Sequence, residues 1–180
     1  MVLIFNKILA VLTVSSHVLL VLGFVYYFVV RKEKENKVIT FLGEHGIQFA
    51  FFFALIAMCS SLFYSDVIGY EPCMLCWYQR IFMYPLVFIF GLAWFKKDSK
   101  ILPYTTLLAS LGLIISLYHN YIYFGGTGFF SCDASGLGVS CLRQYVFEFD
   151  YVTIPSMALT SFILILVFSK LHQIYSSKNK

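Results

Sequence analysis

Long apolar runs alternate with short polar segments along almost the whole chain. A helix that crosses a bilayer needs about 20 consecutive apolar residues, and five runs come close to that length or exceed it. They cover residues 8–30, 46–67, 77–95, 101–124 and 152–169. This pattern predicts an all-α integral membrane protein, in which a four-helix transmembrane bundle follows one extra N-terminal transmembrane helix.

The composition supports this class of protein. Hydrophobic residues make up 60% of the 180 residues, and charged residues make up only 12%. Such a chain leaves no room for a soluble catalytic domain or for a nucleotide or flavin site. The net charge of +4 comes from basic segments between the spans and gives no reason to invoke nucleic acid.

The distribution of cations predicts the orientation in the membrane. Most of the 13 Lys and Arg residues lie in segments 31–37, 96–100 and 170–180, which share one side of the membrane if the spans alternate. This side is predicted to be cytoplasmic, with the N-terminus outside and the C-terminus inside. A signal peptide is the alternative for the first run. The basic flank follows that run and no Ala-x-Ala pattern appears, so a retained helix is favoured.

Four of the five cysteines are predicted to lie in two pairs on the outer face. Cys73 and Cys76 form a Cys-x-x-Cys motif where the third span begins, and Cys132 and Cys141 lie in the last outer loop. Disulfides persist outside the cytoplasm, which suits this placement. The motif could be a structural disulfide, part of a zinc site or a redox-active pair. Cys59 lies within a span, where we interpret it as a small hydrophobic residue.

The position of the Cys-x-x-Cys motif favours redox chemistry. Thiols at a helix N-terminus have a lowered pKa, because the helix dipole favours the thiolate. A zinc site is disfavoured because Cys132 and Cys141 are farther apart than the two to four residues usual for zinc ligands. Haem attachment is excluded because Trp77, and not a histidine, follows Cys76.

Two polar residues near the motif are candidates for supporting roles. Arg80 lies four residues after Cys76, one helical turn away on the same face, where its charge could stabilise the thiolate. It could also simply anchor the helix at the membrane interface. His119 lies near the outer end of the fourth span, where it could donate a hydrogen bond to a carbonyl oxygen or shuttle a proton. Alternatively, it is only a solvated residue of the interfacial belt.

The segment after the last cysteine is predicted to form a short amphipathic helix on the outer membrane surface. Its apolar residues repeat at helical spacing, and they are Leu142, Tyr145, Val146 and Phe149. Such a helix would hold the second cysteine pair above the first. Pro155 is predicted to lie in the first turn of the last span, where its missing donor does no harm.

The two cysteine pairs together suggest an electron relay. Exchange between a dithiol and a disulfide moves two electrons, which a membrane protein must pass on in order to turn over. The outer loop faces soluble proteins, whereas the motif faces lipid. We therefore expect the donor to be a soluble dithiol protein and the acceptor to be a lipid-soluble two-electron carrier, a quinone.

Residues 46–170 resemble the disulfide bond formation protein B family, particularly its short-loop, BdbC-like branch. The resemblance rests on the motif at residues 72–80, Pro-Cys-Met-Leu-Cys-Trp-Tyr-Gln-Arg, on the later cysteine pair and on Ile154-Pro155. It implies three parts: the extra helix and basic loop (1–37), a four-helix redox domain (38–171) and a cytoplasmic tail (172–180). The extra helix is a departure from the family's four spans. The vitamin K epoxide reductase family is a rival, but there the loop cysteines precede the Cys-x-x-Cys motif.

The resemblance also implies a reaction. The protein would be an oxidoreductase of the bacterial cytoplasmic (inner) membrane, with its cysteines facing the periplasm or exterior. It would reoxidise a DsbA-like thioredoxin-fold oxidase and reduce ubiquinone or menaquinone. Cys76 would abut the quinone as the charge-transfer thiolate, Arg80 would lie beside the quinone, and His119 would lie close to it.

The remaining cysteines would carry the exchange with the partner. The resemblance implies that Cys73 forms a disulfide with Cys76 and exchanges with the loop pair. Cys132 would receive the partner's attack, with Cys141 as its own partner, although the short gap between them leaves their order open. A non-enzymatic membrane scaffold stapled by two structural disulfides is the alternative from a different class.

Overall fold

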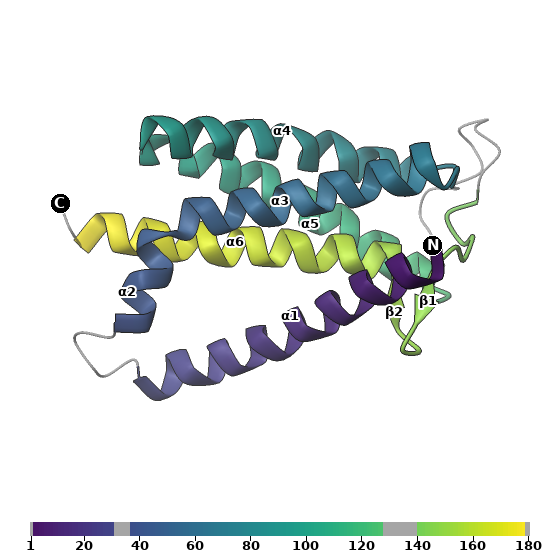
Figure 1. The fold of residues 1–180 in the computed structure, drawn as a ribbon, viewed down its shortest axis with the longest axis horizontal. Helices are drawn as coiled ribbons and strands as arrows, with labels where there is room; N and C mark the ends of the chain where they lie inside the picture. Colours follow the sequence, from purple (N-terminus) through teal and green to yellow (C-terminus); the bar gives the residue numbers. More distant parts are fainter. Residues whose placement is uncertain (1, 31–36, 128–139, 179–180) are drawn as a thin grey trace.

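A computed structural model of the chain describes residues 2–30, 37–127 and 140–178. Figure 1 shows long helices lying side by side, with a short hairpin at one end. The elements in chain order are α1 (Val2–Val30), α2 (Lys37–Glu44), α3 (Gly46–Leu62), the π-helical turn η1 (Phe63–Val67), α4 (Met74–Lys96), the 3-10 turn η2 (Ser99–Ile101), α5 (Leu102–Tyr123), β1 (Phe147–Glu148), β2 (Val152–Thr153) and α6 (Ile154–Lys178).

The prediction of five spans and a helical bundle is confirmed. Five helices within the described residues are long and apolar enough to cross a membrane, and α1 is one of them. In the bundle, α3 and α5 each pack against both α4 and α6. The core between them consists mainly of aliphatic and aromatic side chains, among them Leu86, Phe90, Phe162 and Ile165. Among the described residues, this core cluster contains no side chain of α1, which lies at the edge of the bundle (Figure 1).

Two glycines allow neighbouring helices to approach closely. A Cβ atom at Gly112 of α5 would lie 2.3 Å from the ring of Phe162 on α6, which is completely buried. A Cβ atom at Gly46 of α3 would lie 2.6 Å from the carbonyl oxygen of Phe168, also on α6. Small residues at such contacts are the usual means of packing helices in lipid, where dispersion forces act only at short range.

We expect Gly112→Ala to destabilise the bundle by about 1–3 kcal/mol, because the added methyl group forces the buried Phe162 ring to move. Thermal unfolding of the purified protein in detergent measures this loss. Gly23→Ala on α1 is the matched control, because no atom lies within 4 Å of a Cβ atom there. Equal unfolding temperatures for the two variants would contradict the tight packing of α5 on α6.

The predicted surface helix after Cys141 is wrong. The segment contains an antiparallel hairpin, in which Phe147 pairs with Thr153 and Glu148 pairs with Val152. Phe149 and Asp150 at its turn have φ angles of 53° and 61°, a conformation that a right-handed helix excludes. The hairpin buries Val152 and Thr153 completely, so tertiary packing outweighs the local helical spacing of apolar residues.

The end of the hairpin also starts the last helix. The Thr153 amide donates to Ser156 Oγ over 2.7 Å, and the Ser156 amide donates to Thr153 Oγ1 over 3.2 Å. These reciprocal bonds form a capping box that fixes where α6 begins. Pro155 lies in the first turn of α6, as predicted. A short helix that the apolar pattern did not predict, α2, precedes α3.

A candidate thiol exchange site

The Cys-x-x-Cys motif begins helix α4. Cys73 is the N-cap residue, with extended φ and ψ angles of −70° and 172°, and its sulfur accepts a hydrogen bond from the Cys76 amide over 3.4 Å. Both cysteines are free thiols, and their sulfur atoms lie 3.0 Å apart. The first turn of the helix thus brings the two sulfurs together, so that a disulfide can form with little movement.

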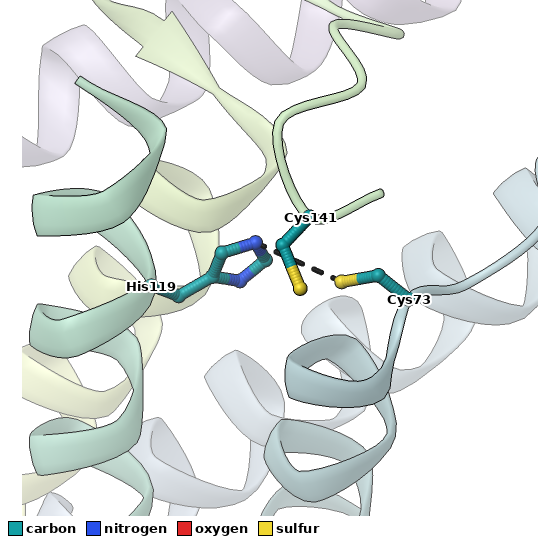
Figure 2. Close-up of side chains that lie close together, drawn as sticks. All are labelled: Cys73, His119 and Cys141. Carbon is teal, nitrogen blue, oxygen red and sulfur yellow. Dashed lines mark hydrogen bonds between the residues drawn. The ribbon is translucent and has the colours of Figure 1, made fainter. Parts of the chain in front are cut away.

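Two further residues surround Cys73 (Figure 2). His119 of α5 directs its Nε2 atom at the Cys73 sulfur over 3.8 Å, and Cys141 approaches from the segment before the hairpin. One side-chain atom from each of the three residues lies within 4.8 Å of the other two. Cys73, His119 and Cys141 are 5%, 2% and 3% exposed, so the cluster is closed to bulk solvent. Figure 2 shows that the three side chains come from three separate parts of the fold.

The pKa of Cys73 is lowered, which favours its thiolate form. The hydrogen bond from the Cys76 thiol is the main cause that lowers the pKa of Cys73 from 9.0 to about 4, against the opposing effect of burial. The hydrogen bond and the charge of His119 lower the pKa further. A stabilised thiolate makes the reduced form of a cysteine pair more favourable, so the corresponding disulfide becomes a stronger oxidant.

This pKa predicts an unusual pH dependence of the reduction potential of the Cys73–Cys76 pair. Above about pH 4 the Cys73 thiolate stays ionised, so reduction takes up a single proton, on Cys76. We expect the potential to fall by about 30 mV for each pH unit, half the slope of about 60 mV for a pair that takes up two protons. Equilibration with thiol buffers between about pH 5 and pH 8 measures the slope. A slope near 60 mV over this range would contradict the thiolate.

Cys141 is disulfide-bonded. Cys132, its expected partner, lies outside the described residues. Three side chains as close together as Cys73, His119 and Cys141 can in principle bind a metal ion. A sulfur atom in a disulfide is no thiolate ligand, however, and metal binding requires the thiolate. The cluster as it stands is therefore arranged for disulfide exchange: the Cys73 thiolate lies next to one sulfur of the disulfide that contains Cys141.

A cavity of about 220 Å³ opens from the cysteines into the bundle. Cys76, Arg80 and His119 all line it. Arg80 donates from Nη2 to the Ser61 carbonyl oxygen over 3.1 Å, and its guanidinium lies 5.2 Å from the centre of the Trp77 ring. The structure thus places Arg80 on the wall of the same cavity as Cys76, with its orientation fixed by Ser61 and Trp77.

Two residues that line this cavity each carry a buried polar atom without a partner in the described part of the chain, which the sequence did not predict. Among the described residues, neither His119 Nδ1 nor the Tyr123 hydroxyl has a hydrogen-bond partner. Both residues line the cavity, one helical turn apart on α5. The spacing of four residues between them is the signal that could have added Tyr123 to the candidate site. Buried polar groups are normally paired, so two unpaired polar atoms this close together are an unusual feature of the site.

Comparison with known proteins identifies the family. Residues 44–171 match the family model described as "Disulfide bond formation protein DsbB". The chain belongs to this family. It is a multi-pass membrane protein of disulfide bond formation, as the resemblance of its Cys-x-x-Cys motif predicts. No solved structure matches the chain.

Several bacterial relatives are similar over the same region. The chain is 45% identical to disulfide bond formation protein C of Bacillus subtilis over 115 residues, which are 64% of this chain and 83% of the relative. It is 44% identical to probable disulfide formation protein C 1 of Bacillus anthracis, over 70% of this chain and 90% of the relative. A second Bacillus anthracis protein, probable disulfide formation protein C 2, is 37% identical over 78% of this chain and 99% of the relative.

Proposed function

We propose that this protein reoxidises a soluble thioredoxin-fold dithiol oxidase of the DsbA type and passes two electrons to a membrane quinone. The observation that carries the proposal is the position of the Cys73 sulfur. It lies 3.0 Å from Cys76 on one side and within 4.8 Å of Cys141 on the other. One sulfur atom can therefore belong to a disulfide with either neighbour, which is what a relay between two cysteine pairs requires.

The burial of Cys141 suggests the order of the exchange. With 3% of its surface exposed, Cys141 is beyond the reach of a cysteine on a folded partner. We infer that the partner's thiolate attacks Cys132, forms a mixed disulfide with it and releases Cys141 as a thiolate. This assigns Cys132 to the first contact with the partner, the point that the sequence leaves open.

The electrons then pass from the loop pair to the helix pair. The Cys141 thiolate attacks Cys73, so the Cys73–Cys141 bond forms, the Cys73–Cys76 bond breaks and the electron pair leaves on Cys76. The partner's second thiol resolves the mixed disulfide, which releases the oxidised partner and a Cys132 thiolate. That thiolate attacks Cys141, restores the Cys132–Cys141 bond and leaves Cys73 and Cys76 reduced. The proposal is supported by the described cysteines, since Cys73 and Cys76 are free and Cys141 is bonded, the pairing expected at the end of this sequence.

The cavity next to Cys76 fits a quinone. Its walls are mainly apolar, and the polar residues that line it include Arg80, His119 and Tyr123. An apolar cavity with a few converging polar groups is the usual form of a small-molecule site. Arg80, His119 and Cys76 would hold the ring end of the quinone. Oxidation of a Cys73 thiolate and a Cys76 thiol to the disulfide releases two electrons and one proton. A quinone bound here would accept both and would take its second proton from water.

The orientation of the protein follows from its cysteines and cations. Cys73 is the N-cap residue of α4, at one end of the bundle, and Cys141 lies beside it. We propose that this end faces the periplasm or exterior and that the bundle spans the bacterial cytoplasmic membrane, because disulfide exchange needs an oxidising compartment. The Lys and Arg residues at the opposite ends of the spans then face the cytoplasm.

The decisive experiment follows quinone reduction by the purified protein after a reduced thioredoxin-fold dithiol protein is added. Ubiquinone and menaquinone analogues are tested separately. We expect turnover with at least one of them, and one oxidised partner molecule for each quinone reduced. If the protein were instead a scaffold stapled by two structural disulfides, no quinone would be reduced. The reduction potential of the Cys73–Cys76 pair would then lie well below about −300 mV, a value typical of structural disulfides.

Substitution of Arg80 is expected to weaken the use of quinone more than the use of the protein partner. Because its guanidinium lines the cavity, Arg80→Ala should raise the KM for quinone by about tenfold and leave the KM for the dithiol partner unchanged. Steady-state kinetics with each substrate varied in turn separates the two effects. Arg80→Lys keeps the charge and should recover part of the loss. An equal change in both KM values would contradict a role at the quinone.

A further inference from the structure

The cavity that begins at the reactive cysteines continues to the extra helix α1. Four residues of α1 line it: Leu9, Leu12, Thr13 and Ser16. Across from them, Phe53 and Ile56 of α3 line the same cavity, as does Cys76 at the start of α4. The described residues thus line one continuous space whose walls include the thiols, the Arg80 guanidinium and the residues of α1, which we call the α1 wall.

Polar contacts hold α1 in this position both before Leu9 and after Ser16, the first and last residues of the α1 wall. Before the wall, the Tyr64 hydroxyl donates to Asn6 Oδ1 over 2.9 Å, in a buried contact. After it, His17 Nε2 lies 2.7 Å from Thr160 Oγ1, and His17 Nδ1 lies 3.3 Å from the Tyr151 hydroxyl. Hydrogen bonds between helices are an effective way of holding them together in lipid. Residues 9–16 are therefore fixed at both ends, and α1 is not a loosely attached anchor.

The wall itself offers apolar surface to the cavity. The Thr13 hydroxyl donates to the Leu9 carbonyl oxygen, and the Ser16 hydroxyl donates to the Leu12 carbonyl oxygen, each over 2.8 Å. Because both hydroxyls are satisfied within α1, they are not needed as donors by a ligand. Together with the two leucines, they form a surface suited to a hydrocarbon chain and poorly suited to the polar ring of a quinone.

This wall lies outside the part of the chain that the family shares. The family model begins at residue 44, beyond the end of α1 at Val30. The alignment with the second Bacillus anthracis protein covers 99% of that relative but only 78% of this chain. A four-helix relative built on the matched residues alone would have lipid where this chain has Leu9, Leu12, Thr13 and Ser16.

We infer that α1 is a wall of the quinone site and contacts the apolar tail of the quinone, so that it determines which tail lengths the protein accepts. The inference rests on the proposed quinone reduction. The ring end of the quinone lies toward Cys76 and Arg80, and its first isoprene units run along Leu9 and Leu12. The matched region supplies the redox chemistry, and α1 adds selectivity among quinones.

The test compares tryptophan substitutions at two neighbouring residues of α1. Leu12 and Val11 are equally exposed, at 51% each, but only Leu12 lines the cavity. We expect Leu12→Trp to raise the KM for a quinone with a long isoprenoid tail by about tenfold and to change little for a tail-less quinone. Val11→Trp should match the wild type with both. Leu12→Ala, which only enlarges the cavity, serves if the tryptophan variant does not fold.

A second measurement does not depend on turnover. A quinone analogue with a photoreactive azide on its tail is irradiated with the wild-type protein, and the labelled peptide is identified by mass spectrometry. We expect label within residues 9–16, and Leu12→Trp should reduce it. Label on other segments only, together with unchanged KM values in the Leu12 variants, would overturn the role of α1. A wild-type protein that reduces no quinone and takes up no label would instead overturn the proposed function.

Discussion

Quinone reduction by a Cys76→Ala variant is expected to fall by about 10³-fold or more, because this substitution removes the sulfur that carries electrons from the helix pair to the quinone in the proposed relay. Cys76 is the half-buried member of the pair and lines the cavity, whereas Cys73 is buried between Cys76, His119 and Cys141. The measurement is the rate of quinone reduction with a reduced thioredoxin-fold partner, together with circular dichroism as a test of folding.

Cys59→Ala provides the control for this experiment. Cys59 is also a free thiol on a spanning helix, but it is exposed on the surface of α3 and does not line the cavity. Its substitution should leave turnover unchanged. Full activity of the Cys76→Ala variant would refute the assignment of the helix pair as the electron donor to quinone.

The Cys141→Ala variant is expected to separate the two halves of the reaction. Turnover with the protein partner should fall by about 10³-fold or more, because no sulfur remains beside Cys73 to pass the partner's electrons on to the helix pair. Quinone reduction driven by a small dithiol such as dithiothreitol should persist, because that reagent can reduce the Cys73–Cys76 bond directly. Both rates are measured by the same quinone absorbance assay.

The outcome of the Cys141→Ala experiment also tests the architecture of the site. If partner-driven turnover survived, Cys73 would exchange with the partner directly, and the approach of Cys141 to Cys73 would have no part in catalysis. If dithiothreitol-driven turnover were also lost, Cys141 would be needed for the structure of the helix pair, and its role in electron transfer would not be separable.

The sequence predicts the bundle well because the membrane imposes a simple rule. Every backbone polar group in lipid must be paired within the span, so a long apolar run has few alternatives to a helix. All five predicted runs accordingly lie largely within long helices. The hairpin at Phe147–Thr153 obeys no such rule. Its strands form because packing buries Val152 and Thr153, an effect of tertiary structure that local spacing does not reveal.

In the candidate site too, some features could be predicted from the sequence and others depend on tertiary packing. Cys73, Cys76 and Arg80 are close in sequence, and the first turns of one helix determine how they lie relative to one another. His119 and Cys141 come from other parts of the chain, and only the packing of α5 and of the segment before the hairpin brings them to Cys73. The interaction of His119 with a thiolate could therefore not be predicted from its place in an apolar span, nor could the wall that α1 contributes to the cavity.

The entry of α1 into the bundle has a practical consequence. The N-terminus of α1 lies at the end of the bundle where α4 begins and where the hairpin lies, while the last turn of α6 lies at the opposite end (Figure 1). Cys73, as the N-cap residue of α4, is at the same end as the N-terminus. A dithiol domain fused ahead of α1 through a flexible linker would be tethered next to its own oxidant. Tethering replaces a bimolecular encounter with an intramolecular one at an effective concentration in the millimolar range. Such a fusion would turn the protein into a self-contained, membrane-bound generator of disulfides.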